Sequence, residues 1–164
     1  MGVFSRNLTG KKRRTCGPCT VCCFVGEIKE LGHKPAYSRC PHQIVRGCGI
    51  HPERPQVCRD FECVWLAGHG RTDDRPDKLG VFLIYVESQF GRICEIHEVV
   101  EGMLETSAVI DFVRRLRIVD KHIIVGVTQR GKMVIAGPES KVHRYREHIR
   151  TSKNAGLDTG FLQV

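Results

Sequence analysis

Residues 15–24 read TCGPCTVCCF, so four cysteines lie within eight consecutive positions and two of them are adjacent. Thiols gathered in this way can be joined by disulfides, share a metal, or remain unlinked. A chain of 164 residues buries roughly 70% of its unfolded surface when it folds, so it does not need disulfides for stability. The choice between a metal and unlinked thiols depends on the remaining cysteines.

The N-terminal residues carry their charges after a short polar start, and no apolar run reaches the length of a membrane span. We therefore expect a cytoplasmic protein that does not bind a membrane, in a compartment where thiols stay reduced. Clustered cysteines in such a compartment indicate metal binding.

Eight of the nine cysteines fall in the first 63 residues, with the spacing C-x2-C-x2-C-C-x16-C-x7-C-x9-C-x4-C. Such spacing is typical of metal-binding proteins, and the predicted ligands are Cys16, Cys19, Cys22, Cys23, Cys40, Cys48, Cys58 and Cys63. The ninth, Cys94, lies in the alternating segment RICEIHEV, which predicts a strand with a buried apolar thiol.

The spacing also suggests how the thiols are shared. C-x2-C-x2-C can curl around one centre, so Cys16, Cys19 and Cys22 are expected to share it, as in a cube-like iron–sulfur cluster. Adjacent residues tend to project in different directions, so Cys23 is expected to serve a second centre or a different metal of one larger cluster. Cys40 precedes a proline, as does the cysteine that closes ferredoxin sites, which makes it a candidate for the remote fourth ligand.

Residues 47–65, GCGIHPERPQVCRDFECVW, place Arg54 and Arg59 beside the later cysteines. These arginines either compensate the charge of a sulfur-rich centre or are ordinary surface residues. His42 and His51 could each replace a cysteine, since imidazole binds both zinc and iron. We expect them instead to support the site from outside the ligand shell or to face solvent.

The segments CGPCTVCC and KPAYSRCPHQIVRGCGIHPERPQVCRDFECVW resemble the YkgJ-like CxxCxxCC family of zinc- or iron-chelating proteins, whose eight cysteines follow in the same order. The resemblance runs from Cys16 to Trp65, about a third of the chain, and implies that the eight cysteines are the metal-binding set. It departs at His51, where the family phrase has a tyrosine, which leaves His51 open as an additional ligand.

Related cysteine segments occur in flagellin lysine methylases, in which an iron–sulfur centre is implied, so the resemblance favours a 4Fe-4S cluster over zinc. Methylation is not expected here, because the chain has neither the glycine-rich turn of a Rossmann-like methyltransferase nor the radical-type spacing C-x3-C-x2-C. We expect a metal-binding protein with a redox role, or one that assists a modification enzyme, acting on an unidentified protein partner or substrate. Whether it is itself an enzyme stays open.

Alternating apolar residues predict a hairpin after the cysteine-rich region, with strands at 80–87 and 92–98 joined by SQFG. Residues 106–118 follow as a helix behind a Thr106 or Ser107 cap, and its predicted core-facing stripe is Val109, Phe112, Val113 and Leu116. Segments 121–127 and 132–137 predict a second hairpin across TQRG. The last helix is expected to begin near Pro138, with a stripe of Val142, Tyr145 and Ile149.

This order, β-β-α-β-β-α, predicts an α+β fold with a mostly antiparallel sheet, to which an irregular cysteine-rich lobe is attached. The predicted organisation is a basic, flexible N-terminus at 1–15, a metal-binding lobe at 16–67, a linker at 68–78, an α+β scaffold at 79–150 and a C-terminal tail at 151–164.

Three basic clusters, at 11–14, 114–117 and 141–150, raise the alternative of a non-enzymatic zinc module that binds RNA or DNA. We favour solvated helix faces, because Phe112 and Tyr145 lie on predicted buried stripes and so would not stack on bases. The formal charge of +8 is also partly the counter-charge of the thiolates. A third possibility is an enzyme that acts on a small substrate at an open iron.

Overall fold

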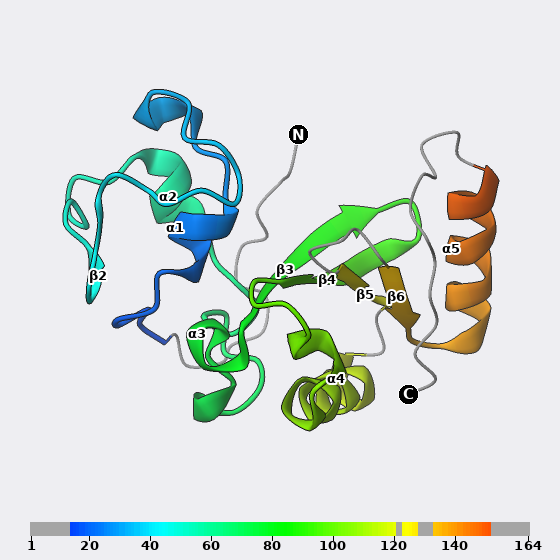
Figure 1. Cartoon of the computed structure of the whole chain (residues 1–164). Helices are drawn as coiled ribbons and strands as arrows, with labels where there is room; N and C mark the ends of the chain where they lie inside the picture. The colour runs from blue at the N-terminus through cyan, green and yellow to red at the C-terminus, as the bar shows by residue number, and fades with distance from the viewer. Residues whose placement is uncertain (1–13, 121–122, 128–132, 152–164) are drawn as a thin grey trace.

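The computed structural model describes residues 14–120, 123–127 and 133–151. Its first part, which we call the cysteine-rich lobe (residues 14–67), is made of short elements joined by turns. These are α1 (Val21–Val25), the 3-10 turn η1 (Lys29–Leu31), β1 (Gln43–Ile44), β2 (Gly47–Cys48) and α2 (Gln56–Asp60). In Figure 1 the lobe and α5 lie at opposite ends of the molecule, with the sheet between them.

Residues 68–78, predicted to be a linker, contain the 3-10 turn η2 (Thr72–Asp74) and most of the short helix α3 (Pro76–Leu79). The buried carboxylate of Asp74 accepts the backbone N–H of Arg71 at 2.6 Å and pairs with Arg115 of the later helix α4 at 2.8 Å. Pro76 and Leu79 are buried as well. This segment is therefore packed against the rest of the protein.

The second part contains β3 (Val81–Ser88), β4 (Gly91–Glu98), the 3-10 turn η3 (Met103–Glu105), α4 (Ser107–Asp120), β5 (Ile123–Val127), β6 (Met133–Ala136) and α5 (Glu139–Thr151). The strands form one sheet in the order β3-β4-β5-β6. Pairings β3–β4 and β5–β6 are antiparallel, while β4 and β5, separated in the chain by α4, are parallel. The predicted α+β class is confirmed.

The turn of the first hairpin follows from the sequence SQFG. Ser88 Oγ donates to the carbonyl of Gly91 at 2.7 Å and accepts the backbone N–H of Phe90 at 3.1 Å. Gly91 has a φ of 87°, a conformation that glycine adopts at no steric cost. Across the strands, Val81 pairs with Glu98 and Ser88 with Gly91. The turn of the second predicted hairpin lies outside the described residues.

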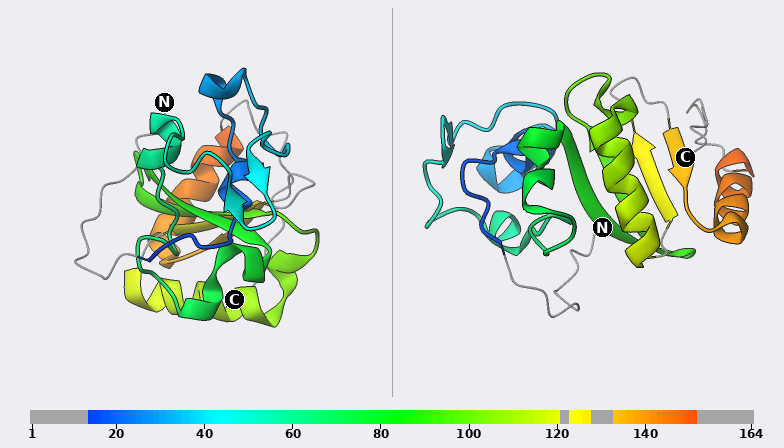
Figure 2. Two further views of the ribbon diagram at one scale, coloured as in Figure 1. Left: turned by 90° about the vertical axis from the view of Figure 1, so that its left-hand side faces the viewer. Right: turned by 90° about the horizontal axis from the view of Figure 1, so that it is seen from below.

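The two faces of the sheet have separate apolar clusters, and Figure 2 shows α4 and α5 packed at different places on the sheet. Leu83, Ile96 and Ile124 point to the side where Phe112 and Leu116 of α4 are buried. Residues at the alternate positions of the same strands, such as Ile93 and Val125, point to the other face of the sheet. They pack there with a stripe of α5 made of Val142, Tyr145 and Ile149.

Both predicted helical stripes are thus confirmed in their positions. Thr106 caps α4, because its Oγ1 accepts the backbone N–H of Val109 at 3.4 Å. Cys94, predicted to be a buried strand thiol, is 2% exposed in the cluster beneath α4.

The lobe packs on the free edge strand of the sheet, β3. Val21 and Val25 of α1 and Trp65 form an apolar cluster with Phe82 of β3. Tyr37 adds a polar link, since its hydroxyl lies 3.3 Å from Nδ1 of His97 in β4. Among the described helices, none is long and apolar enough to cross a membrane.

Candidate metal centre

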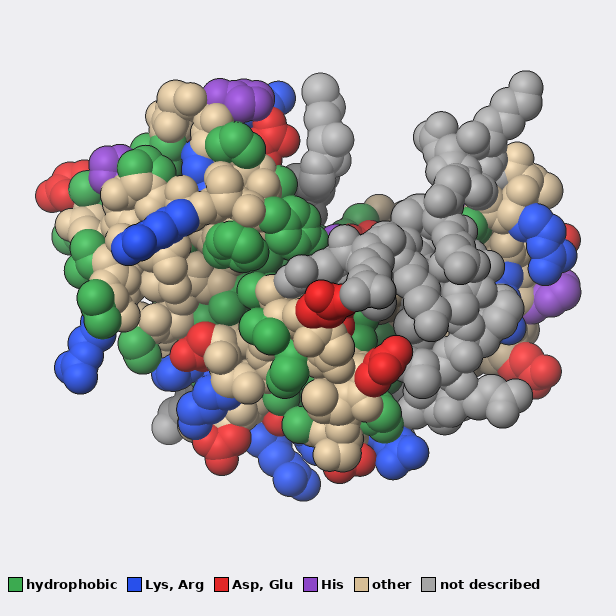
Figure 3. Space-filling view, viewed as in Figure 1, with side chains coloured by type: hydrophobic (Ala, Val, Ile, Leu, Met, Phe, Trp, Pro, Cys, Tyr) green, Lys and Arg blue, Asp and Glu red, His purple; other side chains and the backbone are tan. Residues whose placement is uncertain are grey.

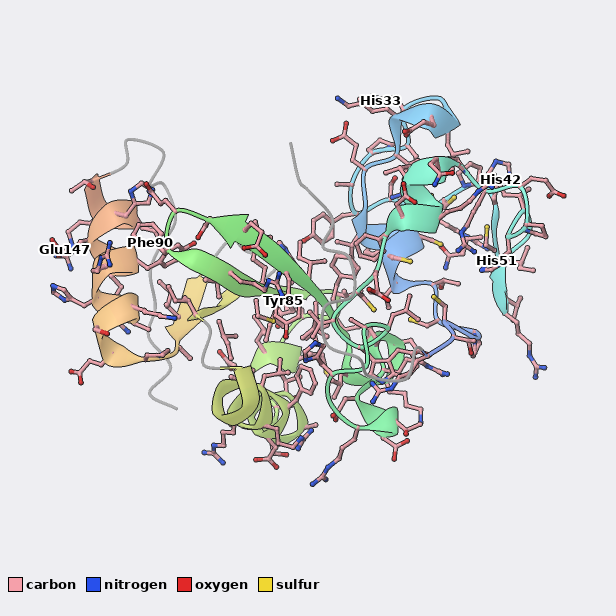
Figure 4. The ribbon with its side chains drawn as sticks, turned by 180° about the vertical axis from the view of Figure 1, so that it is seen from behind. His33, His42, His51, Tyr85, Phe90 and Glu147 are labelled. Atoms are coloured by element: carbon pink, nitrogen blue, oxygen red, sulfur yellow. The ribbon has the colours of Figure 1, made fainter. Side chains whose placement is uncertain are left out.

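Three segments of the lobe carry the eight predicted ligands. The first segment, leading into and through α1, holds Cys16, Cys19, Cys22 and Cys23. The β1–β2 hairpin and the residue stretch before it hold Cys40 and Cys48, and α2 with the residues after it holds Cys58 and Cys63. Figure 4 shows sulfur atoms gathered where these segments meet.

All nine cysteines lie within the described residues, and none of them forms a disulfide. Over this same part of the chain, no group of three or more histidine, cysteine, aspartate or glutamate side chains is arranged so that it could hold a metal ion. What the structure does give is a network of electrostatic interactions among the thiols, which run mostly within two sets of four and also connect Cys16 and Cys22 of the first set with Cys23 of the second.

The first group consists of Cys16, Cys19, Cys22 and Cys63. Electrostatic interactions connect Cys16 and Cys19 with both Cys22 and Cys63. Three members, Cys19, Cys22 and Cys63, also pack in the apolar cluster around Trp65. The sequence spacing predicts that Cys16, Cys19 and Cys22 share a centre, and the structure places Cys63 beside them.

The second group consists of Cys23, Cys40, Cys48 and Cys58. Electrostatic interactions connect Cys58 with the other three. Cys40 is buried just before the hairpin, where its carbonyl accepts the N–H of Gln43 at 3.0 Å. The structure thus places Cys40 with the second group, whereas the sequence makes it a candidate fourth ligand of the first.

The adjacent residues Cys22 and Cys23 join the two groups. The thiol of Cys22 donates a hydrogen bond to the sulfur of Cys23, which raises the pKa of Cys22 well above 9.0 and lowers that of Cys23 to about 7. Positive charges on Lys34 and Arg54 favour the Cys23 thiolate further. Neighbouring positions in the chain therefore have opposite protonation preferences.

Burial is the main cause of the pKa shifts of Cys16, Cys19, Cys58 and Cys63. It raises the pKa of Cys63 to about 11, although the backbone N–H of Leu66 donates to its sulfur at 3.4 Å. The pKa values of Cys16, Cys19 and Cys58 are raised for the same reason. Because thiolates are the ligands, metal binding by these cysteines would release protons.

Lys34 is a buried residue of the lobe that sequence reasoning missed. Its ammonium donates to the carbonyls of Phe24, Gly26 and Pro35 at 2.5–2.8 Å, next to the C-terminal end of α1. Burial lowers its pKa, and interactions with Cys40, Cys23, Cys22 and Cys58 oppose that shift. A lysine is rarely buried, and nothing in the motif HKPAY signals this role.

Arg14 is the one residue of the basic cluster at 11–14 within the described part of the chain. Its guanidinium donates to the carbonyls of Trp65, His69 and Gly70 at 2.7–3.0 Å and lies over the Trp65 ring, 4.9 Å from the centroid. The residue thus anchors the start of the lobe to its last segment.

The two candidate histidines lie toward the hairpin side of the lobe, as Figure 4 shows. His51 is exposed and its Nε2 contacts Nη1 of Arg54. His42 is half-buried, and its carbonyl accepts the N–H of Gly49 at 2.8 Å. These contacts are polar and local to the hairpin and the following loop.

Charges over α4 and α5 are mixed, and Figure 3 shows basic and acidic side chains next to one another there. Arg114 pairs with Asp111 at 3.3 Å, and Arg150 pairs with Glu147 at 2.9 Å. Phe112 is fully buried, and the half-buried ring of Tyr145 packs edge-on against Phe90. Both aromatic rings therefore pack inside, as their helical stripes predict.

Although no group of the described side chains is arranged to hold a metal ion, two features of the lobe are of the kind that a metal–thiolate centre has. Thiolates are soft ligands that suit iron–sulfur clusters and zinc. In addition, two buried atoms, Oε1 of Gln43 and Nε of Arg54, have no hydrogen-bond partner among the described residues. Buried polar atoms without a partner are rare in folded proteins and often mark an atom or ion that completes the site.

No family model matches the chain, and neither curated proteins nor solved structures gave a match.

Proposed function

We propose that the cysteine-rich lobe binds metal through two groups of four cysteines, as one or two iron–sulfur clusters or as two zinc ions. The eight ligands are Cys16, Cys19, Cys22, Cys23, Cys40, Cys48, Cys58 and Cys63. In this proposal the lobe is the metal-binding unit, and the sheet with α4 and α5 is the scaffold that carries it. A reducing compartment such as the cytoplasm is part of the proposal, because the thiols must stay reduced.

The observation that supports this proposal is the gathering of eight thiols without disulfides in one lobe, where their electrostatic interactions run mostly within two sets of four and also link Cys16 and Cys22 to Cys23. Four thiolates are the complete ligand set of a 4Fe-4S cluster and of a structural zinc ion. Scattered structural cysteines would not be expected to gather in this way. The spacing of the eight cysteines between residues 16 and 63 supports the same ligand set.

Iron–sulfur clusters are the favoured occupant. An all-cysteine zinc ion is usually closed and structural, whereas a 4Fe-4S cluster transfers electrons. The protein would then donate or accept electrons, or assist a partner enzyme that modifies its substrate. Its own residues would bind the metal, exclude water through the Trp65 cluster and offset the thiolate charge with Lys34 and Arg54.

Anaerobic purification, followed by an absorption spectrum and elemental analysis of the same sample, tests the occupant. Iron and sulfide in equal amounts, about four or eight per chain, with broad absorption near roughly 400 nm, establish iron–sulfur clusters. About two zinc ions per chain without sulfide establish the structural alternative. Protein that carries and takes up neither metal contradicts the proposal.

Single substitutions test the two groups. Cys63→Ser is expected to remove the metal of the first group, and Cys58→Ser that of the second, so each variant keeps about half of the metal. Cys94→Ser is the matched control, because Cys94 lies in the core beneath α4 and should not affect loading. Loss of all metal in either lobe variant would contradict two independent groups.

A further inference from the structure

Tyr37 lies in the lobe with a backbone conformation that tyrosine rarely adopts. Its φ is 53°, in the left-handed region that few residues other than glycine occupy. The turn that carries it is held by two hydrogen bonds to the carbonyl of Pro35, from Ser38 Oγ at 2.7 Å and from the Lys34 ammonium at 2.8 Å. Strain that the surroundings maintain in this way is common at functional sites.

The side chain of Tyr37 reaches from the lobe to the sheet. Its ring packs edge-on against Phe24, with centroids 6.1 Å apart, and its hydroxyl lies 3.3 Å from Nδ1 of His97 in β4. On the opposite side of the imidazole, Nε2 lies 3.0 Å from Oε2 of Glu95. His97 and Glu95 are alternate residues of β4, so both point to the same face of the sheet. Hydroxyl, imidazole and carboxylate therefore form a continuous row.

The carboxylate of Glu95 determines where His97 carries its proton. A carboxylate only accepts hydrogen bonds, so Nε2 of His97 carries the proton and donates to Glu95. Nδ1 of the neutral ring is then an acceptor, and the Tyr37 hydroxyl donates to it. A hydroxyl that donates to an imidazole, which a carboxylate orients in turn, has the arrangement of an activated nucleophile.

The Tyr37 hydroxyl needs a base, and its side chain is open to a reactant. Burial and the negative charge of Glu95 raise the pKa of Tyr37 above 10.0, so the hydroxyl is protonated at neutral pH. Tyr37 is nevertheless 46% exposed, whereas the side chains of His97 and Glu95 are 22% and 28% exposed. Because the charge that acts on Tyr37 is negative, the site favours an uncharged reactant over a phosphate ester.

We propose that Tyr37, His97 and Glu95 form a second functional site, in which Tyr37 is a nucleophile that accepts an acyl group from an uncharged, activated ester. The Tyr37 oxygen forms a bond with the carbonyl carbon of the ester, and the bond from that carbon to the leaving-group oxygen breaks. Nδ1 of His97 takes the hydroxyl proton and passes it to the departing oxygen, while Glu95 holds the ring in position. This inference is independent of the proposed metal binding.

The ester para-nitrophenyl acetate is a suitable probe, because it is uncharged and its leaving group is coloured. The full chain, purified anaerobically, is treated with this ester and digested with trypsin for mass spectrometry. Residues 30–39 form a tryptic peptide that contains Tyr37 and no cysteine, so acetyl groups on thiols are measured on other peptides. Tyr85 and Tyr145 are internal controls with half-buried rings, and the hydroxyl of Tyr85 also lies near a histidine, 3.4 Å from Nδ1 of His69.

Tyr37 is expected to be acetylated about 100-fold faster than N-acetyltyrosine amide, a fully exposed tyrosine in solution, because a positioned base contributes at least that factor. His97→Gln should remove this gain. Tyr37→Phe keeps the ring that packs on Phe24 and should leave no acetyl group at this position. His143→Gln is the matched control, since His143 is an exposed histidine of α5, and it should stay within about twofold of the unmodified chain.

Glu95 acts through His97, so it is a positioning residue and needs a readout of its own. Nitrogen NMR of the His97 ring reports which nitrogen carries the proton. An amide can donate as well as accept, so Glu95→Gln should give a mixture of both tautomers and lower the acetylation rate by at least about tenfold.

Each contrary result has a distinct meaning. Acetylation of Tyr37 no faster than that of the amide in solution overturns the proposal in the unmodified chain, whether or not the variants fold. A rate that survives in His97→Gln, with circular dichroism and thermal melting unchanged, overturns the role of His97 as the base. Metal content is measured on the same preparation, so a chain that binds no metal but acetylates Tyr37 rapidly would contradict the proposed function alone.

Discussion

The ring of Phe61, just after α2, stacks on the ring of Phe82 in β3, with centroids 5.4 Å apart and ring planes inclined by 15°. This contact joins the cysteine-rich lobe to the edge strand of the sheet, within the apolar cluster around Trp65. Cys19, Cys22 and Cys63 pack against the same cluster. The sheet therefore supports the segments that carry the first cysteine group.

Replacing Phe82 with alanine should destabilise the protein by about 3–4 kcal/mol, because a large side chain that is 5% exposed leaves a cavity. Urea denaturation followed by Trp65 fluorescence measures this loss and reports on the lobe side of the contact. Phe90→Ala is the control, since Phe90 packs on α5 in a different cluster. Equal effects of the two changes on the native Trp65 spectrum would contradict a local role of Phe82.

Arg14→Ala removes donors to three backbone carbonyls and a cation–π contact with Trp65. We expect a loss of about 2 kcal/mol in the free energy of unfolding, together with a change in Trp65 fluorescence. Arg46→Ala is the matched control, because Arg46 is an exposed arginine of the β1–β2 hairpin. A loss no larger than that of the control would show that the Arg14 contacts contribute little.

The helices and the first hairpin could be predicted because their signals are local. Val109, Phe112 and Leu116 recur at helical spacing, and they are the residues that α4 buries. The parallel pairing of β4 with β5 brings together Ile93 and Ile123, which are 30 positions apart. Such a register depends on how α4 packs between the strands, and no local pattern specifies it.

The candidate site shows the same limit. C-x2-C-x2-C predicts that Cys16, Cys19 and Cys22 lie together, since a short turn brings them close. Cys63 reaches this group because it packs beside Trp65 in the cluster that docks on β3. That placement is tertiary, so spacing favours Cys40 instead. Lys34 was missed for a similar reason, because its partners are backbone carbonyls that carry no sequence signal.

The stability contributed by Cys63 should depend on pH in metal-free, reduced protein. Burial raises its pKa from 9.0 to about 11, so the folded state holds this proton more tightly than the unfolded state. The contribution is therefore fully present below about pH 9 and is lost as the pH rises through about 11, by about 3 kcal/mol once the thiol is fully ionised. Other thiols also lose protons in this pH range. The contribution of Cys63 is therefore isolated by comparison with a variant that lacks its thiol.

Cys63→Val is the suitable variant, because valine fills a similar apolar space and does not titrate. Urea denaturation of both proteins between pH 8 and 11 gives the difference in unfolding free energy, which should change by about 2 kcal/mol in favour of the variant as the pH rises. A difference that is constant with pH would contradict the raised pKa of Cys63.

Lys34→Met should destabilise the lobe, although methionine is apolar and of similar length. The carbonyls of Phe24, Gly26 and Pro35 would lose the ammonium that they share, and buried acceptors without a donor are costly. We expect a loss of about 2–3 kcal/mol in the metal-free protein, measured by urea denaturation.

Lys29→Met is the matched control, because Lys29 is exposed in η1 and should tolerate the change within about 0.5 kcal/mol. Lys34→Arg keeps the charge but needs room for a planar group among three converging carbonyls, so it should recover only part of the loss. If Lys34→Met were as stable as the control, the three hydrogen bonds would be replaceable by apolar packing. The buried ammonium would then be retained for its charge beside Cys23, Cys40 and Cys58 and not for the stability of the fold.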